Sequence, residues 1–216
     1  MEFFHLVTAL LKQEANLELV RLAVVYMHLI ACCVAVGLVV TSDLAMARQL
    51  LRGDDSAHCQ PSHLESLQRT ISLALLVLWV TGAAIILLDM SVKDWTYLLN
   101  PKLQAKVLIV ALLTLNGMLL HRAVLPALAR AGSLLALQPA VRSLTLFAGT
   151  VSAVSWFYAA LLGVGRPLAW KYSLAELMAA YPLLIIAGYG VMRLLVALAR
   201  KRSRTDTVST SLPDHQ

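Results

Sequence analysis

The sequence predicts an all-α fold, a polytopic membrane bundle of five transmembrane helices. Hydrophobic residues make up 59% of the 216 residues and charged residues only 14%, whereas a soluble domain has about 25% charged residues. The charges also fall between long apolar runs, each close to the roughly 20 residues that a helix needs to cross a bilayer. One helical bundle therefore accounts for the whole chain.

The apolar runs give the expected positions of the helices. The five spans are expected at residues 19–44, 67–88, 102–121, 144–163 and 173–198. The S-x-x-E pattern of residues 62–65 is a capping box that would start the second helix early. A short interfacial helix is expected within residues 125–137, and Pro182 should kink the fifth helix, which a bundle tolerates.

The chain divides into three parts around this bundle. Residues 18–199 form the five-helix transmembrane bundle. Residues 1–17 lack the basic region and cleavage site of a signal peptide. They form either an amphipathic segment lying in the membrane interface or the first turns of a longer first helix. Residues 200–216, basic and then polar, are expected to be a disordered cytoplasmic tail.

The basic residues predict the orientation of the bundle. Eleven of the 18 Lys and Arg residues lie on the side of the two long loops and the C-terminal tail, and the remaining seven lie on the other side. By the positive-inside rule, this bias puts the N-terminus outside and the C-terminus inside a bacterial inner membrane. The net charge of +6 is thus explained by the basic residues that orient the helices, and nucleic acid is not an expected partner.

The first apolar run carries the most informative side chain, His28. It lies two turns after Arg21, so it should sit about 10 Å deeper on the same helix face. The predicted orientation places Lys106 and Glu176 each about one turn into the third and fifth helices from the outside. Together these residues predict an outward-opening polar pocket with His28 at its floor.

Two interpretations of His28 stay open at this point. An imidazole inside a membrane can ligate a metal or haem iron, or relay protons. Alternatively, a neighbouring hydroxyl satisfies the imidazole, and the lysines extend to the interface. A pair of histidines clamping one haem is not favoured, because His121 falls at the inner end of the third helix. The three cysteines suggest neither a disulfide framework nor a zinc site.

Two further patterns indicate packing. Asp43 and Arg193 lie at similar depths near the inner face, where an ion pair would neutralise both charges. Small residues recur every three or four positions along the fourth helix, which lets a neighbouring helix approach closely. This small-residue stripe consists of Ala148, Ser152, Ser155, Ala159 and Gly163.

Two segments resemble a known family. They are VYMHLIACCVAVGL at residues 25–38 and NPKLQAKVLIVALLTLNGMLLH at residues 100–121. Together they resemble the membrane protoporphyrinogen oxidase family and, more loosely, copper-resistance D-type membrane domains. The resemblance implies that His28 and Lys106 are functional and that haem is associated with the bundle.

The leading functional hypothesis is a small inner-membrane protein that holds haem b, a porphyrin or a quinone-like apolar ligand in a redox-associated role. His28 would be the metal ligand or proton relay and, with Lys106, a catalytic candidate. Arg21, Lys106 and Glu176 would contact the ligand. The alternatives are a non-catalytic subunit or scaffold that packs through the fourth helix, and a small-solute transporter. The expected partners are the lipid bilayer and either a membrane redox protein or a second copy of the chain.

Overall fold

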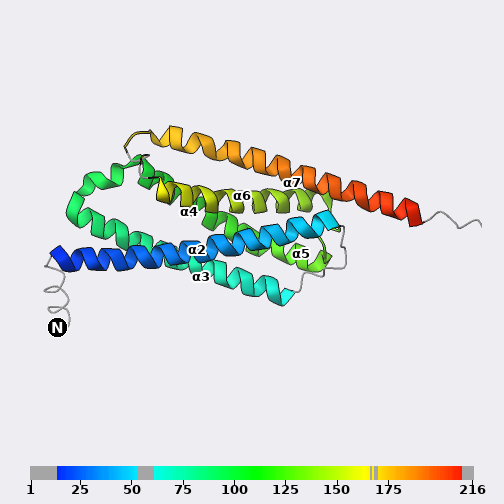
Figure 1. Cartoon of the computed structure of the whole chain (residues 1–216), viewed down its shortest axis with the longest axis horizontal. Coiled ribbons are helices and arrows are strands. Elements are labelled where there is room, and N and C mark those ends of the chain that lie inside the picture. Colours follow the sequence, from blue (N-terminus) through cyan, green and yellow to red (C-terminus); the bar gives the residue numbers. More distant parts are fainter. Residues whose placement is uncertain (1–13, 53–60, 166, 168–169, 211–216) are drawn as a thin grey trace, which may run out of the picture.

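The computed structural model describes residues 14–52, 61–165, 167 and 170–210, and all regular structure in these ranges is helical (Figure 1). Five helices are long and apolar enough to cross a membrane, which confirms the predicted helical class. The long helices are α2 (Glu14–Arg52), α3 (Pro61–Lys93), α4 (Pro101–Leu119), α6 (Pro139–Val164) and α7 (Leu174–Thr210). Three short elements complete the fold: η1 (Trp95–Leu99), η2 (Leu120–Val124) and α5 (Leu125–Ala131).

The long helices lie side by side and alternate in direction (Figure 1). Helix α2 packs along α3, while α6 packs against α4, α7 and α2 and is the most buried of the five. We call the end of the bundle where α2, α4 and α7 begin the Arg21 end. The opposite end, where α6 begins, is the Arg142 end. Helix α7 projects beyond its neighbours at the Arg142 end (Figure 1).

The outer surface of the bundle is apolar. Large side chains such as Leu22 on α2, Leu87 on α3 and Ile186 on α7 are each more than 60% exposed. A water-soluble bundle rarely exposes so many contiguous apolar side chains, whereas a lipid environment accepts them. The surface is therefore compatible with a multi-pass membrane protein.

Helices α4, α6 and α7 are held together by small and polar side chains. Ala148 and Ser155 of α6 are fully buried, as the small-residue stripe predicts, whereas Gly163 at the end of the stripe is exposed. The amide of Asn116 on α4 donates a 2.8 Å hydrogen bond to the carbonyl of Ala148. The Tyr181 hydroxyl of α7 lies 2.8 Å from that of Ser155, so one of the two donates to the other.

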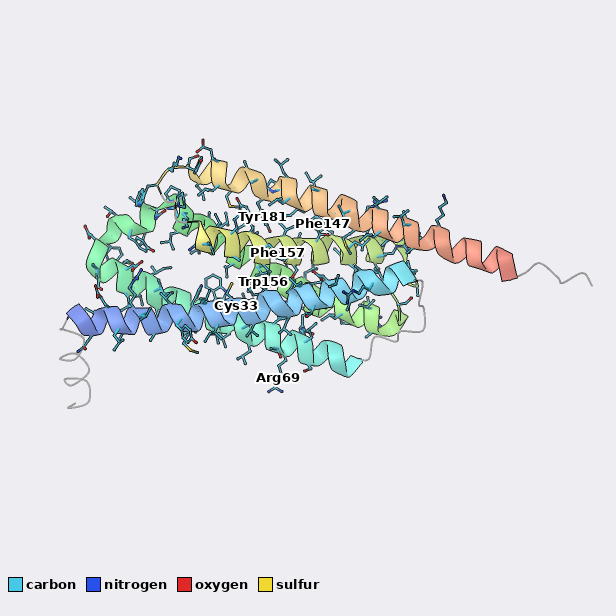
Figure 2. All side chains as sticks on the ribbon, viewed as in Figure 1. Cys33, Arg69, Phe147, Trp156, Phe157 and Tyr181 are labelled. Carbon is cyan, nitrogen blue, oxygen red and sulfur yellow. The ribbon has the colours of Figure 1, made fainter. Side chains whose placement is uncertain are left out.

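Glycine allows the closest approach between α6 and α7. A Cβ atom added to Gly188 would lie 2.9 Å from Cγ2 of Thr150, closer than real Cβ atoms come to a neighbour. On the other side of α6, Trp156 is buried against the faces of α2 and α3 around Ala35 and Leu78 (Figure 2). Helix α6 thus joins the α2–α3 pair to α4 and α7.

The polypeptide after α4 differs from the prediction of a separate interfacial helix. Helix α4 continues without a break through the π-helical turn η2 into α5. The cause is Pro126, which lacks an N–H and would clash with the carbonyl four residues earlier in an α-helix. In the wider turn, the N–H of Leu125 donates to the carbonyl of Leu120. The helix ends at Gly132, whose φ of 73° is accessible to glycine.

The helix ends also differ from the predicted boundaries. Helix α2 begins at Glu14 and α3 begins at Pro61, one residue before the predicted capping box. Helix α7 passes through Pro182 and extends to Thr210, where a disordered tail was expected. No glycine or proline lies between Gly190 and Thr210 to end that helix. The predicted interfacial segment, residues 1–17, lies mostly outside the described residues.

Candidate functional site

An ion pair joins α2 to α3 at the Arg21 end. The Nε atom of Arg21 donates to Oδ1 of Asp89 across 2.8 Å. The Asp89 side chain is 5% exposed and that of Arg21 is 48% exposed, so the pair places its anion inside and its cation at the rim. A carboxylate buried to this degree needs such a partner, because removing it from water is costly. The sequence analysis did not predict this pairing.

The short loop between α3 and α4 brings a third polar group to this pair. The hydroxyl of Tyr97, in η1, hydrogen-bonds to the carboxylate of Asp89. Burial, and then the hydrogen bond and negative charge of Asp89, raise the pKa of Tyr97 to about 12. The tyrosine therefore remains a neutral donor at physiological pH. The sequence analysis missed Tyr97, because no helical periodicity places a loop residue.

Caps at both ends of η1 fix this loop. At its start, Oδ1 of Asp94 accepts a 2.7 Å bond from the N–H of Trp95. At its end, Oδ1 of Asn100 accepts a 3.0 Å bond from the N–H of Lys102 and so caps α4, with Pro101 in the first turn. Asn100 and Pro101 thus start α4 and also fix the loop that holds Tyr97 beside Asp89.

The imidazole of His28 is held by a hydroxyl of α3. Its Nδ1 atom lies 2.8 Å from Oγ1 of Thr81. The Thr81 hydroxyl donates its single proton to the carbonyl of Val77, 2.6 Å away, so it must accept from Nδ1–H. The hydrogen-bond network thereby assigns the neutral tautomer in which Nε2 carries the lone pair. Gly82 lies beside the ring, and a Cβ added there would be in ordinary van der Waals contact with Cε1 of His28, at 3.6 Å.

This arrangement combines the two interpretations of His28. A neighbouring hydroxyl does satisfy one ring nitrogen, as the packing interpretation expects. The other nitrogen, Nε2, has no hydrogen-bond partner in the described part of the chain. A ring nitrogen fixed by one hydrogen bond with the second left as a lone pair is the state in which histidine binds metals or accepts protons.

Lys106 lies on α4 within electrostatic reach of the His28 imidazole. Its side chain is half-buried, and the buried Lys102 lies one turn earlier on the same helix. No described carboxylate forms an ion pair with Lys106. The arrangement brings Arg21, His28 and Lys106 to the same end of the bundle.

Glu176, the fourth predicted site residue, has a different local role. Its Oε2 atom accepts bonds of 2.7 Å and 2.9 Å from the N–H and hydroxyl of Ser173. In return, the Ser173 hydroxyl accepts from the N–H of Glu176. This is a capping box, S-x-x-E, that starts α7. The exposed carboxylate makes no described contact with His28, so its role at a ligand stays a prediction.

Two other expectations about ionisable residues can be compared with the structure. The predicted ion pair between Asp43 and Arg193 is not among the described contacts. The guanidinium of Arg193 instead lies over the ring of Tyr189, 5.9 Å from its centroid. His121 lies exposed in η2, away from the Arg21 end, so it is not placed to share one ligand with His28.

The donor atoms at the Arg21 end suit some ligands better than others. No group of three or more His, Cys, Asp or Glu side chains in the described residues could hold a metal ion by itself. A haem needs only one axial ligand from the protein, since the porphyrin supplies the other nitrogens. The Nε2 lone pair of His28 and the Lys106 ammonium therefore fit an iron porphyrin that carries acidic groups.

Comparison with known proteins gives no further information on the family or the ligand of this chain. No family model, curated protein or solved structure matches the chain. The resemblance to the membrane protoporphyrinogen oxidases, which rests on the segments around His28 and Lys106, stays a prediction.

Proposed function

We propose that the chain is a small multi-pass membrane protein that binds an apolar ligand bearing an acidic group, haem b or a related porphyrin in the first place, in a redox-associated role. The observation that carries this proposal is the state of His28. Thr81 fixes its Nδ1–H, and Nε2 remains free within reach of the Lys106 charge. A quinone-like ligand would use the same two side chains for proton transfer and charge compensation.

The chemistry of each residue follows from its environment. Nε2 of His28 would ligate iron or accept a proton. Lys106 would neutralise a ligand carboxylate, which offsets the cost of a half-buried ammonium that no described carboxylate pairs with. Arg21 is committed to Asp89, yet its exposed half can still attract an anion entering from the rim. When bound, haem b would supply one-electron chemistry.

The membrane setting of this proposal rests on the five long apolar helices. The excess of Lys and Arg near the Arg142 end favours that end facing the cytoplasm. The Arg21 end would then face the outside of a bacterial inner membrane. Under this orientation, His28 lies in the outer half of the membrane, below Arg21 and Asp89.

The structure gives less support to the scaffold hypothesis. That hypothesis depends on the small-residue stripe of α6 packing against a partner protein. Ala148 and Ser155 of the stripe are instead buried by helices of the same chain. Only the end of the stripe at Gly163 remains exposed, which is too little surface to carry a stable interface by itself.

An absorption spectrum of the purified protein tests the proposed function. The full chain is extracted in a neutral detergent, and its visible spectrum is recorded before and after titration with hemin. His28→Gln is the test variant, because glutamine can still donate to Thr81 but cannot ligate iron as imidazole does. His121→Gln is the matched control, because it makes the same change at an exposed histidine of the other end.

We expect a Soret band in the wild type and in His121→Gln, and its loss in a folded His28→Gln protein. Wild-type haem occupancy in His28→Gln would end the assignment of His28 as the ligand. A wild-type protein that binds neither haem nor porphyrin would end the haem hypothesis. Loss of the band in both variants would show that the change at His28 is not specific.

A further inference from the structure

Three arginines meet at the Arg142 end of the bundle. Arg142 lies in the first turns of α6 and is 8% exposed, while Arg193 and Arg200 lie on the last part of α7 and are exposed. The packing of α6 on α7 brings them together, because Leu146, Val196 and Ala199 share one buried cluster. Each of these apolar residues lies on the same helix within one turn of one of the arginines.

The guanidinium of Arg142 is anchored on one side only. Its Nη1 atom donates to the carbonyls of Leu135 and Leu137, each 3.4 Å away, in the turn that precedes α6. Its Nε and Nη2 atoms make no hydrogen bond to any residue that the structure describes. No buried side-chain nitrogen or oxygen of the described residues lacks a partner, so these two atoms reach the surface. Their N–H donors are therefore available to a ligand.

Arg193 is oriented by an aromatic side chain. Its guanidinium lies 5.9 Å from the ring centroid of Tyr189. The hydroxyl of Tyr189 in turn lies 2.6 Å from that of Ser143, the residue after Arg142. This chain of contacts holds the aromatic ring between α6 and α7 and keeps Arg193 on the side of Arg142.

The charges of this cluster are not balanced by described carboxylates. Arg193 and Arg200 both act on Arg142 as like charges. Among the acidic side chains that the structure describes, only Asp43 lies in this half of the bundle, and it forms no ion pair. One buried guanidinium with two exposed ones beside it favours a bound anion, which would offset their mutual repulsion.

The depth of the cluster indicates which anion. The part of α7 from Leu174 to Arg193 is about 28 Å long, and the hydrocarbon core of a bilayer is about 30 Å thick. Arg193 thus falls at the boundary of the hydrocarbon, and Arg200 lies about 10 Å farther along the helix. This is the zone of the lipid phosphates. The argument depends on the membrane insertion proposed above, but not on any ligand of His28.

We propose that Arg142, Arg193 and Arg200 form a binding site for a phosphate group, supplied by an anionic lipid of the surrounding leaflet. Guanidiniums bind phosphate oxygens through paired N–H donors, and basic sites between membrane helices are suited to anionic headgroups. The acyl chains of the lipid would lie along the exposed apolar surface of α7. A soluble phosphate would offer the same headgroup chemistry without those chains.

Lipid-dependent thermal stability of the full chain tests this site. The delipidated protein in neutral detergent is titrated with cardiolipin, with phosphatidylcholine and with inorganic phosphate. The test variant is Arg193→Gln/Arg200→Gln, because both side chains are exposed and tolerate the change. The matched control is Arg48→Gln/Arg122→Gln, which removes two exposed arginines of the same end that lie on α2 and η2.

We expect cardiolipin, but not phosphatidylcholine, to raise the unfolding temperature of the wild type and of the control variant. In the test variant, the apparent affinity for cardiolipin should be at least tenfold weaker. Equal weakening in both variants would show a diffuse charge effect and overturn the site. An equal response to inorganic phosphate alone would overturn the lipid as the source. Failure of membrane insertion would show separately, as release of the protein from membranes by alkaline carbonate.

Discussion

The 2.8 Å contact between Arg21 and Asp89 ties α2 to α3 at one end of the bundle. The two residues are far apart in the sequence, yet one supplies the buried anion and the other its cation at the rim. Tyr97 completes the arrangement from the loop that follows α3. This pair lies at the same end of the bundle as His28 and Lys106.

Removal of the buried carboxylate should destabilise the bundle. Asp89→Asn removes the charge that Arg21 and Tyr97 share, and we expect a loss of about 1–3 kcal/mol, since a hydrogen bond to a charged group contributes about that amount. Thermal unfolding in detergent measures the effect. Asp94→Asn is the control, because asparagine can still accept from the N–H of Trp95. Equal unfolding temperatures for the two variants would contradict the role of Asp89.

Titration of Tyr97 should make stability fall in alkaline solution. Its pKa is raised from 10.0 to about 12, so the folded protein keeps a proton that the unfolded chain loses. The stabilisation is complete below pH 10 and is lost as the pH rises toward about 12. We expect a steeper alkaline loss of unfolding temperature in the wild type than in Tyr97→Phe. Identical slopes would mean that Tyr97 is not held by Asp89.

The contact between α6 and α7 can be tested with two glycines of one helix. Gly188→Ala would place a methyl group 2.9 Å from Cγ2 of Thr150, and we expect a loss of about 1–3 kcal/mol from overpacking. Gly190→Ala meets nothing within 4 Å and should be neutral or slightly stabilising.

Relief of the clash should rescue the first of these variants. Thr150→Ser removes Cγ2 but keeps the hydroxyl that donates to the carbonyl of Leu146. Added to Gly188→Ala, it should recover part of the lost unfolding temperature. If Gly188→Ala and Gly190→Ala behave alike, the two helices do not approach as closely as described.

The hydroxyl of Thr81 should position the imidazole of His28. Thr81→Val removes the acceptor for Nδ1–H, and we expect at least tenfold weaker haem affinity, whereas Thr81→Ser should bind as the wild type does. Hemin titration followed by absorbance gives both values. Thr70→Val on the same helix is the control, because among the described residues its hydroxyl bonds only to the carbonyl of Ser66. Unchanged affinity in Thr81→Val would remove the positioning role.

The orientation of the chain is open to a labelling test. Cys59 lies between the first two apolar helices in the sequence, outside the described residues, and the charge bias predicts that this segment faces the cytoplasm. A membrane-impermeant maleimide should therefore label Cys59 only after the cells are broken, with Cys59→Ser as the blank. Labelling in intact cells would reverse the predicted orientation.

Local sequence signals predicted parts of the fold well and missed others for identifiable reasons. Apolar runs located the five long helices, because the length and composition of a span are properties of the segment itself. The capping box of Glu176 was present in the sequence as S-x-x-E, but the carboxylate was interpreted as a ligand contact. The extension of α4 past Pro126 was missed, because a π-helical turn can absorb a proline that an α-helix cannot.

The sequence by itself determined the helical class and the number of apolar helices. It also determined the distance between Arg21 and His28 along the first of these helices, because the rise per residue of a helix is nearly constant. Only the tertiary structure decided which side chains meet. The pairing of Arg21 with Asp89, of His28 with Thr81 and of Arg142 with α7 depends on how each helix is rotated and which helix it packs against. The rotation and the neighbours of each helix depend on contacts between segments that are distant in the sequence, such as the contact of Gly188 with Thr150. These contacts cannot be predicted from the sequence of one segment alone.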